Sequence, residues 1–309
     1  MAKLLPSTYF GRETQRYSVS FMKNVLILGF FDGIHLGHRE VISSAVDYAK
    51  DARGKTTLIT FLDSPLKYFN NSAEYIFSRE DSVNKIKELG VDEVVEQDFS
   101  KIVSMPAENY LKNLYTKYSP IAIFTGFNHT FGFKKSGTPE FLNLHQEKYN
   151  YEYHCIPPRF ENGEIVSSTL IKSFLKTGEI RKANLLLGSQ FHINGKVEKG
   201  AQLGRQIGFP TANISYPEGI VKVPYGVYSV VVSIEGRKYS GVLNWGIKPT
   251  VGNTQKPIAE VHILNFYQDI YGKEIQISFV EKIRDEMKFS SLAELKQQIQ
   301  EDIKRCLES

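Results

Sequence analysis

The sequence predicts a doubly wound parallel α/β sheet, followed by a small closed β-barrel with a terminal helix. Three observations predict this. Apolar runs alternate with amphipathic stretches from residue 24 to about 156, short strand-like runs follow Gly188, and an amphipathic stretch closes the chain. The 309 residues suffice for two domains, which usually contain about 100–200 residues each. We place their boundary between residues 187 and 188.

Strands and helices alternate in the first half, as expected for a parallel sheet. The predicted strands are residues 25–30, 56–61, 93–96, 121–125 and 151–156. The predicted helices are residues 38–53, 79–89, 106–118 and 138–149, with Pro106 and Pro139 in first turns. Ligands of such sheets bind at the carboxyl ends of the strands, so His35 and Asn128 could face one pocket. We assign no secondary structure or role to residues 1–22.

A helix is expected over residues 168–187, at the end of the first half, and Gly188 would end it. The strand-like runs are residues 191–197, 225–234, 238–245, 259–264 and 274–283, rich in β-branched residues. Short strands separated by turns predict a closed barrel. A terminal helix is expected over residues 291–307, capped by Ser290 or Ser291. Its apolar face would contain Leu292, Leu295, Ile299 and Ile303.

Composition excludes several classes of protein. The net charge of +4 is small, and no lysine or arginine tract occurs, so we expect no nucleic acid partner. No run of about 18 apolar residues occurs, so we expect no membrane span. Cys155 and Cys306 lack CxxC spacing, which argues against a disulfide framework or a thiolate zinc site. With no secretory signal recognised near Met1, we expect a cytoplasmic protein; the oligomeric state is left open.

Residues 29–38 read Gly-Phe-Phe-Asp-Gly-Ile-His-Leu-Gly-His, directly after the apolar run 25–28. His35 and His38 are three apart at the expected start of a helix, so both can point toward one phosphate. Helix N-termini present free N–H groups and a partial positive charge. Gly33 and Gly37 would let the main chain approach the ligand. Structural histidines are the alternative; a zinc site is disfavoured because no HExxH pattern or third ligand is present.

The segment 31–38 resembles the HxGH motif of the nucleotidyltransferase superfamily, most closely the FMN adenylyltransferase module of prokaryotic bifunctional FAD synthetases. Residues 126–132 resemble that family's loop after the fourth strand, which implies that Asn128 binds the flavin substrate. Residues 166–172 resemble its SSTxxR motif. The resemblance implies an ATP site formed by Gly29, Phe31, Gly33, Gly37, Ser167, Ser168, Thr169 and Lys172.

Two positions depart from that pattern. Lys172 stands where arginine is usual, and Ile165 stands where a second arginine is common. Lysine keeps a point charge but loses the bidentate fork of arginine, and isoleucine loses both. These departures affect the expected strength of adenylyl transfer and leave the expected fold unchanged. Ser167–Thr169 alone would also suit an ordinary helix cap.

A second segment, residues 204–213, reads Gly-Arg-Gln-Ile-Gly-Phe-Pro-Thr-Ala-Asn. Gly204 and Gly208 permit tight turns close to an anion. Thr211 and Asn213 alternate, so on an extended chain both face one side, where a hydroxyl and an amide oxygen can hold Mg²⁺ and a phosphate. A polar turn of the barrel is the alternative.

This segment resembles the GRxxGFPTAN motif of riboflavin kinase, and the resemblance continues to the C-terminus. It implies that Glu260 is the general base for the ribityl 5′-hydroxyl and that Arg284 contacts the flavin. A carboxylate near that hydroxyl can accept its proton as the γ-phosphoryl group arrives. Alone on a strand, such a glutamate would more often be a solvated charge.

Together the resemblances imply a bifunctional transferase that makes FMN from riboflavin and FAD from FMN, with ATP as co-substrate and Mg²⁺ as cofactor. Two alternatives stay open. One is a riboflavin kinase with weak or lost adenylyl transfer, because of Ile165 and Lys172. The other is a flavin-binding regulator without enzymatic activity, which would bind flavin but consume no ATP.

Overall fold

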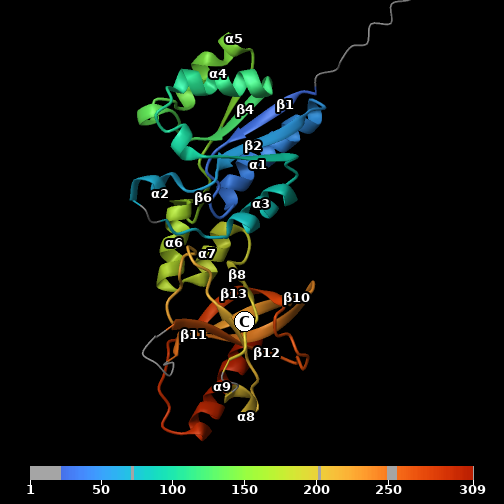
Figure 1. The fold of residues 1–309 in the computed structure, drawn as a ribbon, viewed down its shortest axis with the longest axis vertical. Coiled ribbons are helices and arrows are strands. Elements are labelled where there is room, and N and C mark those ends of the chain that lie inside the picture. Colours follow the sequence, from blue (N-terminus) through green and yellow to red (C-terminus); the bar gives the residue numbers. More distant parts are fainter. Residues whose placement is uncertain (1–21, 71–72, 201–202, 249–255, 309) are drawn as a thin grey trace, which may run out of the picture.

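The computed structural model describes residues 22–70, 73–200, 203–248 and 256–308. Figure 1 shows a sheet module (residues 22–165) at one end of the molecule and a barrel (residues 192–308) at the other. Helices α6 (Ser168–Thr177) and α7 (Ile180–Leu187) lie between them. The predicted fold class, an α/β domain followed by a small barrel with a terminal helix, is confirmed.

The sheet module contains five parallel strands in the order β3-β2-β1-β4-β5. Their bounds are β1 (Asn24–Leu28), β2 (Lys55–Phe61), β3 (Glu93–Gln97), β4 (Pro120–Gly126) and β5 (Glu152–Ile156). β1 is buried along its whole length at the centre of the sheet. The chain order runs outward from β1 in both directions, so β1 and β4 border the point at which ligands of such sheets bind.

Helices cover both faces of this sheet. They are α1 (Leu36–Asp51), α3 (Arg79–Glu88), α4 (Ala107–Tyr118) and α5 (Pro139–Tyr149). The short helix α2 (Pro65–Asn70) follows β2 and packs against η1 (Phe99–Lys101). Val25 and Ile27 of β1 pack with α1 in one hydrophobic cluster, and Leu26 and Leu28 pack with α4 and α5 in another. The uninterrupted apolar run of β1 is explained by this double coverage, because successive side chains point to opposite faces.

Two predicted helix starts are wrong by one or two residues. α1 begins at Leu36 rather than at residue 38, because the His35 side chain accepts the His38 N–H and caps the helix. Pro106 is the residue before α4 and not part of its first turn. Pro139 does occupy the first turn of α5, and Thr138 caps that helix as expected.

The single helix predicted over residues 168–187 is also wrong. α6 ends where Gly178 adopts a left-handed conformation (φ 80°), and α7 starts two residues later. Glycine reaches such a φ without a Cβ clash, so it ends the first helix and redirects the chain. The predicted stop at Gly188 is confirmed, with φ 62°.

The barrel is a nearly closed six-stranded sheet in the order β8-β13-β10-β11-β12-β9. Its strands are β8 (His192–Lys196), β9 (Ala212–Ser215), β10 (Gly226–Ile234), β11 (Arg237–Lys248), β12 (Lys256–Ile263) and β13 (Glu274–Arg284). A bridge between Glu198 and Asn213 joins its two edges. β9 was not among the predicted strands.

The terminal helix α9 (Leu292–Glu308) covers part of the barrel. Ser291 caps it, since its Oγ accepts the Glu294 N–H at 3.2 Å. Of the residues expected on its apolar face, Ile303 packs beside the buried Cys306, whereas Leu292 in the first turn is 59% exposed. Among the described residues, no helix is long and apolar enough to cross a bilayer.

The two halves are joined by packing as well as by the chain. Buried residues of α6 and α7, including Ile171 and Leu187, share one hydrophobic cluster with the strands of the barrel. Ile76 and Phe77, from the segment between α2 and α3, enter the same cluster. Tyr75 and Ile220 pair through their backbones. The sheet module and the barrel therefore share an apolar interior.

Candidate active sites

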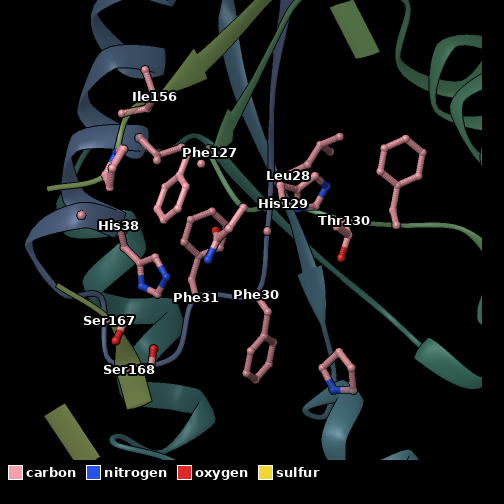
Figure 2. A pocket seen from close by; sticks show the side chains of 18 of the residues that line it. Leu28, Phe30, Phe31, His38, Phe127, His129, Thr130, Ile156, Ser167 and Ser168 are labelled. Atoms are coloured by element: carbon pink, nitrogen blue, oxygen red, sulfur yellow. The ribbon is translucent and has the colours of Figure 1, made fainter. Parts of the chain in front are cut away.

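A cavity of about 680 Å³ lies at the carboxyl ends of β1 and β4, against the first turns of α1 and α6. Most of the residues predicted for the first site line it: Gly29, Phe31, His35, Gly37, His38, Asn128, Ser167, Ser168 and Thr169. Figure 2 shows His38 near Ser167 and Ser168 on one side of the cavity, with Phe127, His129 and Thr130 farther along it. The fold thus brings three distant motifs around one space.

His35 and His38 are arranged as a stacked pair. Their ring centroids are 3.6 Å apart with 19° between the planes, and the His38 N–H donates to His35 Nδ1 at 3.3 Å. Because Nδ1 of His35 accepts this bond, a neutral ring carries its proton on Nε2. The first turn of α1 therefore offers an imidazole N–H beside the free backbone N–H groups of the helix.

Both histidines are neutral at pH 7. Burial lowers the pKa of His35 from 6.5 to about 4. Burial and the neighbouring His35 lower the pKa of His38 well below its ordinary value. Nδ1 of His38 is buried and has no hydrogen-bond partner within the described residues. This pair therefore binds an anion through hydrogen bonds and the helix dipole, and not through the charge of an imidazolium.

The start of α6 is held against the HxGH turn. Ser167 caps α6 by accepting the Leu170 N–H at 3.3 Å, and Ser168 Oγ donates to the Asp32 carbonyl at 2.8 Å. Thr169 is exposed and lines the cavity. Two helix N-termini, from α1 and α6, therefore border the same cavity, which favours a ligand with several negative charges.

Two residues predicted for this site lie elsewhere. Gly33 has φ 89°, and a Cβ atom placed on it would lie 2.7 Å from Ile76 Cδ1. Glycine is needed at this position because a side chain would strain the turn and clash with Ile76. Gly33 does not line the cavity. Lys172 does not line the cavity either; its Nζ lies 2.5 Å from Asp32 Oδ2.

His129 lines the cavity and was not predicted. Burial lowers its pKa from 6.5 to about 4, and its Nε2 has no hydrogen-bond partner among the described residues. It follows Asn128 directly in the loop after β4. A buried neutral imidazole in a loop gives no periodic sequence signal, and only its place beside Asn128 could have suggested it.

The barrel carries the second candidate site. A cavity of about 420 Å³ is lined by Arg205, Pro210 and Thr211, and by residues 266–271 after β12. Asn213 lies directly opposite Glu260 in the β9–β12 pair, and Asn244 lies opposite Glu260 on its other side. Residues directly opposite in adjacent strands share a face. Glu260 therefore lies between two amides, next to the strand that follows Thr211.

The turn before β9 is compact. A Cβ atom placed on Gly204 would lie 2.3 Å from the Phe209 carbonyl oxygen, so this turn requires glycine for its own packing. Gly208 is left-handed, with φ 90°. Nδ1 of His262, a residue for which we predicted no role, lies 2.8 Å from the Pro210 carbonyl oxygen, and this contact ties the turn to β12.

Comparisons with known proteins identify the family of each half of the chain. A family model described as FAD synthetase matches residues 19–170, and one described as riboflavin kinase matches residues 187–309. A bifunctional riboflavin kinase/FMN adenylyltransferase of Bacillus subtilis is 32% identical over 91% of this chain and 90% of its own. One from Buchnera aphidicola is 35% identical, with 91% of each chain covered. The chain belongs to the bifunctional riboflavin kinase/FMN adenylyltransferase family.

A solved structure from Streptococcus pneumoniae shares the fold over almost the whole length. Its TM-score is 0.85 at 31% identity, with 92% of this chain and 94% of that chain covered. That protein is described as a macrolide-efflux protein. The agreement extends over both halves, so the sheet module and the barrel occur together in that protein too.

Arg284 occupies a structural position in this member of the family. Its guanidinium pairs with Asp302 of α9, with Nε 2.9 Å from Oδ1 and Nη2 2.8 Å from Oδ2. Asp302 is buried, and Arg284 is 14% exposed. The predicted contact of Arg284 with flavin stays a prediction, and the contact seen here fixes α9 to the end of β13.

Proposed function

We propose that the cavity of the sheet module binds ATP and FMN and transfers AMP from ATP to FMN, which yields FAD and pyrophosphate. The observation that carries this assignment is the meeting of His35, His38 and the first turns of α1 and α6 around one cavity. A group transfer of this kind needs positioned donors for phosphoryl oxygens and no covalent intermediate on the protein.

In this reaction an oxygen of the FMN phosphate attacks the α-phosphorus of ATP, and the bond from that phosphorus to the bridging oxygen of pyrophosphate breaks. His35 and His38 donate N–H groups to the phosphoryl oxygens on which charge develops. The N–H groups of the α1 and α6 first turns supply further donors. Asn128, exposed at the cavity, binds the flavin.

The barrel phosphorylates riboflavin to FMN. Glu260 accepts the proton of the ribityl 5′-hydroxyl while that oxygen attacks the γ-phosphorus of ATP, and ADP leaves. The position of Glu260 opposite Asn213 supports this role, because it places the base beside the Gly204–Asn213 motif.

Thr211 and Asn213 would hold the Mg²⁺ that accompanies ATP. Hydroxyl and amide oxygens suit this hard cation, which usually keeps water and phosphate ligands as well. No group of three or more His, Cys, Asp or Glu residues that could hold a metal occurs within the described residues. This fits an ion that arrives with the nucleotide, and its role would be to neutralise charge on the phosphate oxygens.

The two activities are tested separately on the full chain. Riboflavin with ATP and Mg²⁺ should yield FMN, and supplied FMN with ATP and Mg²⁺ should yield FAD and pyrophosphate. Production of FMN without FAD would contradict the assignment of the sheet module. Flavin binding without consumption of ATP would contradict both assignments and favour the regulator.

A second candidate is a riboflavin kinase with weak adenylyl transfer. The pairing of Lys172 with Asp32 and the apolar side chain at Ile165 favour it, because neither position brings a cation into the cavity. A rate of FAD formation far below that of FMN formation, with both substrates saturating, would support this candidate.

We assign the reactions to the cytoplasm. Both consume ATP, and Cys155 and Cys306 are free thiols, which suits a reducing compartment.

A further inference from the structure

The cavity of the sheet module lacks cations at the two positions where the family resemblance expects them. Ile165 lines the cavity, and its apolar side chain is 41% exposed. Lys172 is turned to Asp32. A triphosphate carries several negative charges, and His35 and His38 are neutral, so any cationic side chain that contacts the phosphates comes from another position.

Arg159 is placed to supply it. It follows β5 and lines the cavity. Its carbonyl accepts the Val166 N–H at 2.9 Å, directly before the Ser167 cap of α6. A Cβ atom placed on Gly37, in the first turn of α1, would lie 3.8 Å from the Cβ of Arg159. The arginine therefore stands at the first turns of both helices that border the cavity.

The guanidinium is held by contacts that a nucleotide can replace. Nη1 lies 3.0 Å from Glu40 Oε1 and Nη2 lies 3.4 Å from Glu161 Oε2, and the Arg159 side chain is 45% exposed. Exposed ion pairs of this kind contribute little to stability. Guanidinium binds phosphate through two parallel hydrogen bonds, which are stronger than a contact with an exposed carboxylate.

Within the described part of the chain, the other lysines and arginines of the cavity wall are Lys134 and Lys135, both in η2 (Phe133–Lys135). The Lys134 ammonium lies over the Phe133 ring, 5.4 Å from its centroid. They belong to the loop after β4, which also carries Asn128. Arg159, unlike them, has backbone contact with the segment that leads into α6.

We propose that Arg159 binds the β- and γ-phosphates of ATP in this cavity and stabilises the departing pyrophosphate. On binding, its guanidinium leaves Glu40 and Glu161. This inference rests on the proposed adenylyl transfer.

The test compares Arg159→Ala, Arg159→Lys and wild type as full-length chains, with FAD formation from supplied FMN as the assay. Loss of charge-assisted hydrogen bonds should lower kcat/KM for ATP by about 10- to 100-fold in Arg159→Ala. Arg159→Lys should recover part of the loss. The KM for FMN and the phosphorylation of riboflavin by the barrel should stay unchanged.

A reverse assay separates phosphate binding from a structural role. With FAD and pyrophosphate as substrates, Arg159→Ala should raise the KM for pyrophosphate in parallel with the KM for ATP. Arg79→Ala is the matched control, because Arg79 is an exposed arginine paired with Glu96 and does not line the cavity. Its constants should equal those of wild type.

Two failures are distinguishable. Wild type that makes no FAD would overturn the adenylyl transfer itself and the role of Arg159 with it. Wild type that makes FAD while Arg159→Ala keeps its constants for ATP and pyrophosphate would overturn only the role of Arg159.

Discussion

The buried carboxylate of Asp32 forms an ion pair with the ammonium of the half-buried Lys172, 2.5 Å away, and this pair joins the HxGH turn to α6. The other carboxylate oxygen, Oδ1, accepts the Ile76 N–H at 2.8 Å, and the Asp32 carbonyl accepts Ser168 Oγ. Asp32 thus ties its own turn to two other segments, the first turns of α6 and the chain at Ile76, and Lys172 is engaged in this contact.

Lys172→Met should destabilise the protein by about 3 kcal/mol, because it leaves the Asp32 carboxylate buried without its partner. Chemical unfolding followed by fluorescence measures this. Lys172→Arg should stay within about 1 kcal/mol of wild type, and so should Lys176→Met, which breaks an exposed pair with Glu74 one turn later. If Lys172→Met instead kept full stability and raised only the KM for ATP, the lysine would contact phosphate as the resemblance implies.

His38→Ala should lower FAD formation by about 100-fold or more, since it removes a donor to the phosphoryl oxygens. Phosphorylation of riboflavin by the same preparation should continue at the wild-type rate. His145→Ala is the control, because His145 pairs with Glu108 away from the cavity. Equal loss of both activities in His38→Ala would point to misfolding and contradict a local role.

Glu260→Gln should reduce FMN formation by about 100-fold or more, because the amide cannot accept the 5′-hydroxyl proton. FAD formation from supplied FMN is the internal control and should be unaffected. Glu274→Gln, at an exposed carboxylate of β13, should change neither rate. Wild-type FMN formation in Glu260→Gln would remove this residue from the reaction.

Stability should fall as the pH drops from about 6.5 toward 4. The folded-state pKa of His35 and of His129 is about 4, against 6.5 ordinarily, so the unfolded chain binds more protons in this window. Their contribution to the free energy of unfolding is complete above pH 6.5. It is lost as the pH falls through 4, by up to about 3 kcal/mol for each histidine. Urea midpoints at pH 7 and pH 4.5 measure the slope, and His129→Gln should flatten it.

Residues 166–309 should fold and phosphorylate riboflavin better than residues 188–309. The shorter fragment begins at the predicted boundary, but it lacks α6 and α7, which pack into the barrel cluster. The lost burial of Ile171 and Leu175 alone should lower the free energy of unfolding by about 3–6 kcal/mol. Thermal unfolding and the kinase assay compare the fragments. Equal stability would support the boundary at residue 187.

The parts of the fold that the sequence predicted well have strong patterns. β1 is an unbroken apolar run, and α5 has Thr138 as a cap with Pro139 in its first turn. The parts that it missed depend on tertiary contacts. β9 has four residues and exists because β12 pairs with it. The break between α6 and α7 rests on the φ of Gly178, which composition alone does not fix.

The same distinction applies to the first cavity. Motif residues such as His38 and Ser167 were found because their spacing is characteristic. Lys172 was predicted to contact phosphate because the motif has a cation there, but its partner Asp32 is 140 positions away in the sequence. Arg159 was missed, because only the folded chain brings it beside Gly37.

The shared interior of the two halves limits how members of this family can be recombined. Ile76 and Phe77 enter the apolar cluster from the sheet module, and α6 and α7 enter it from the connecting segment. Consider a chimaera that joins the sheet module of one relative to the barrel of another. Its shared apolar cluster combines side chains from two parents, unless residues 75–77 and helices α6 and α7 come from the same parent as the barrel. Such a chimaera therefore needs three junctions between the parent sequences: one on each side of residues 75–77 and one ahead of α6.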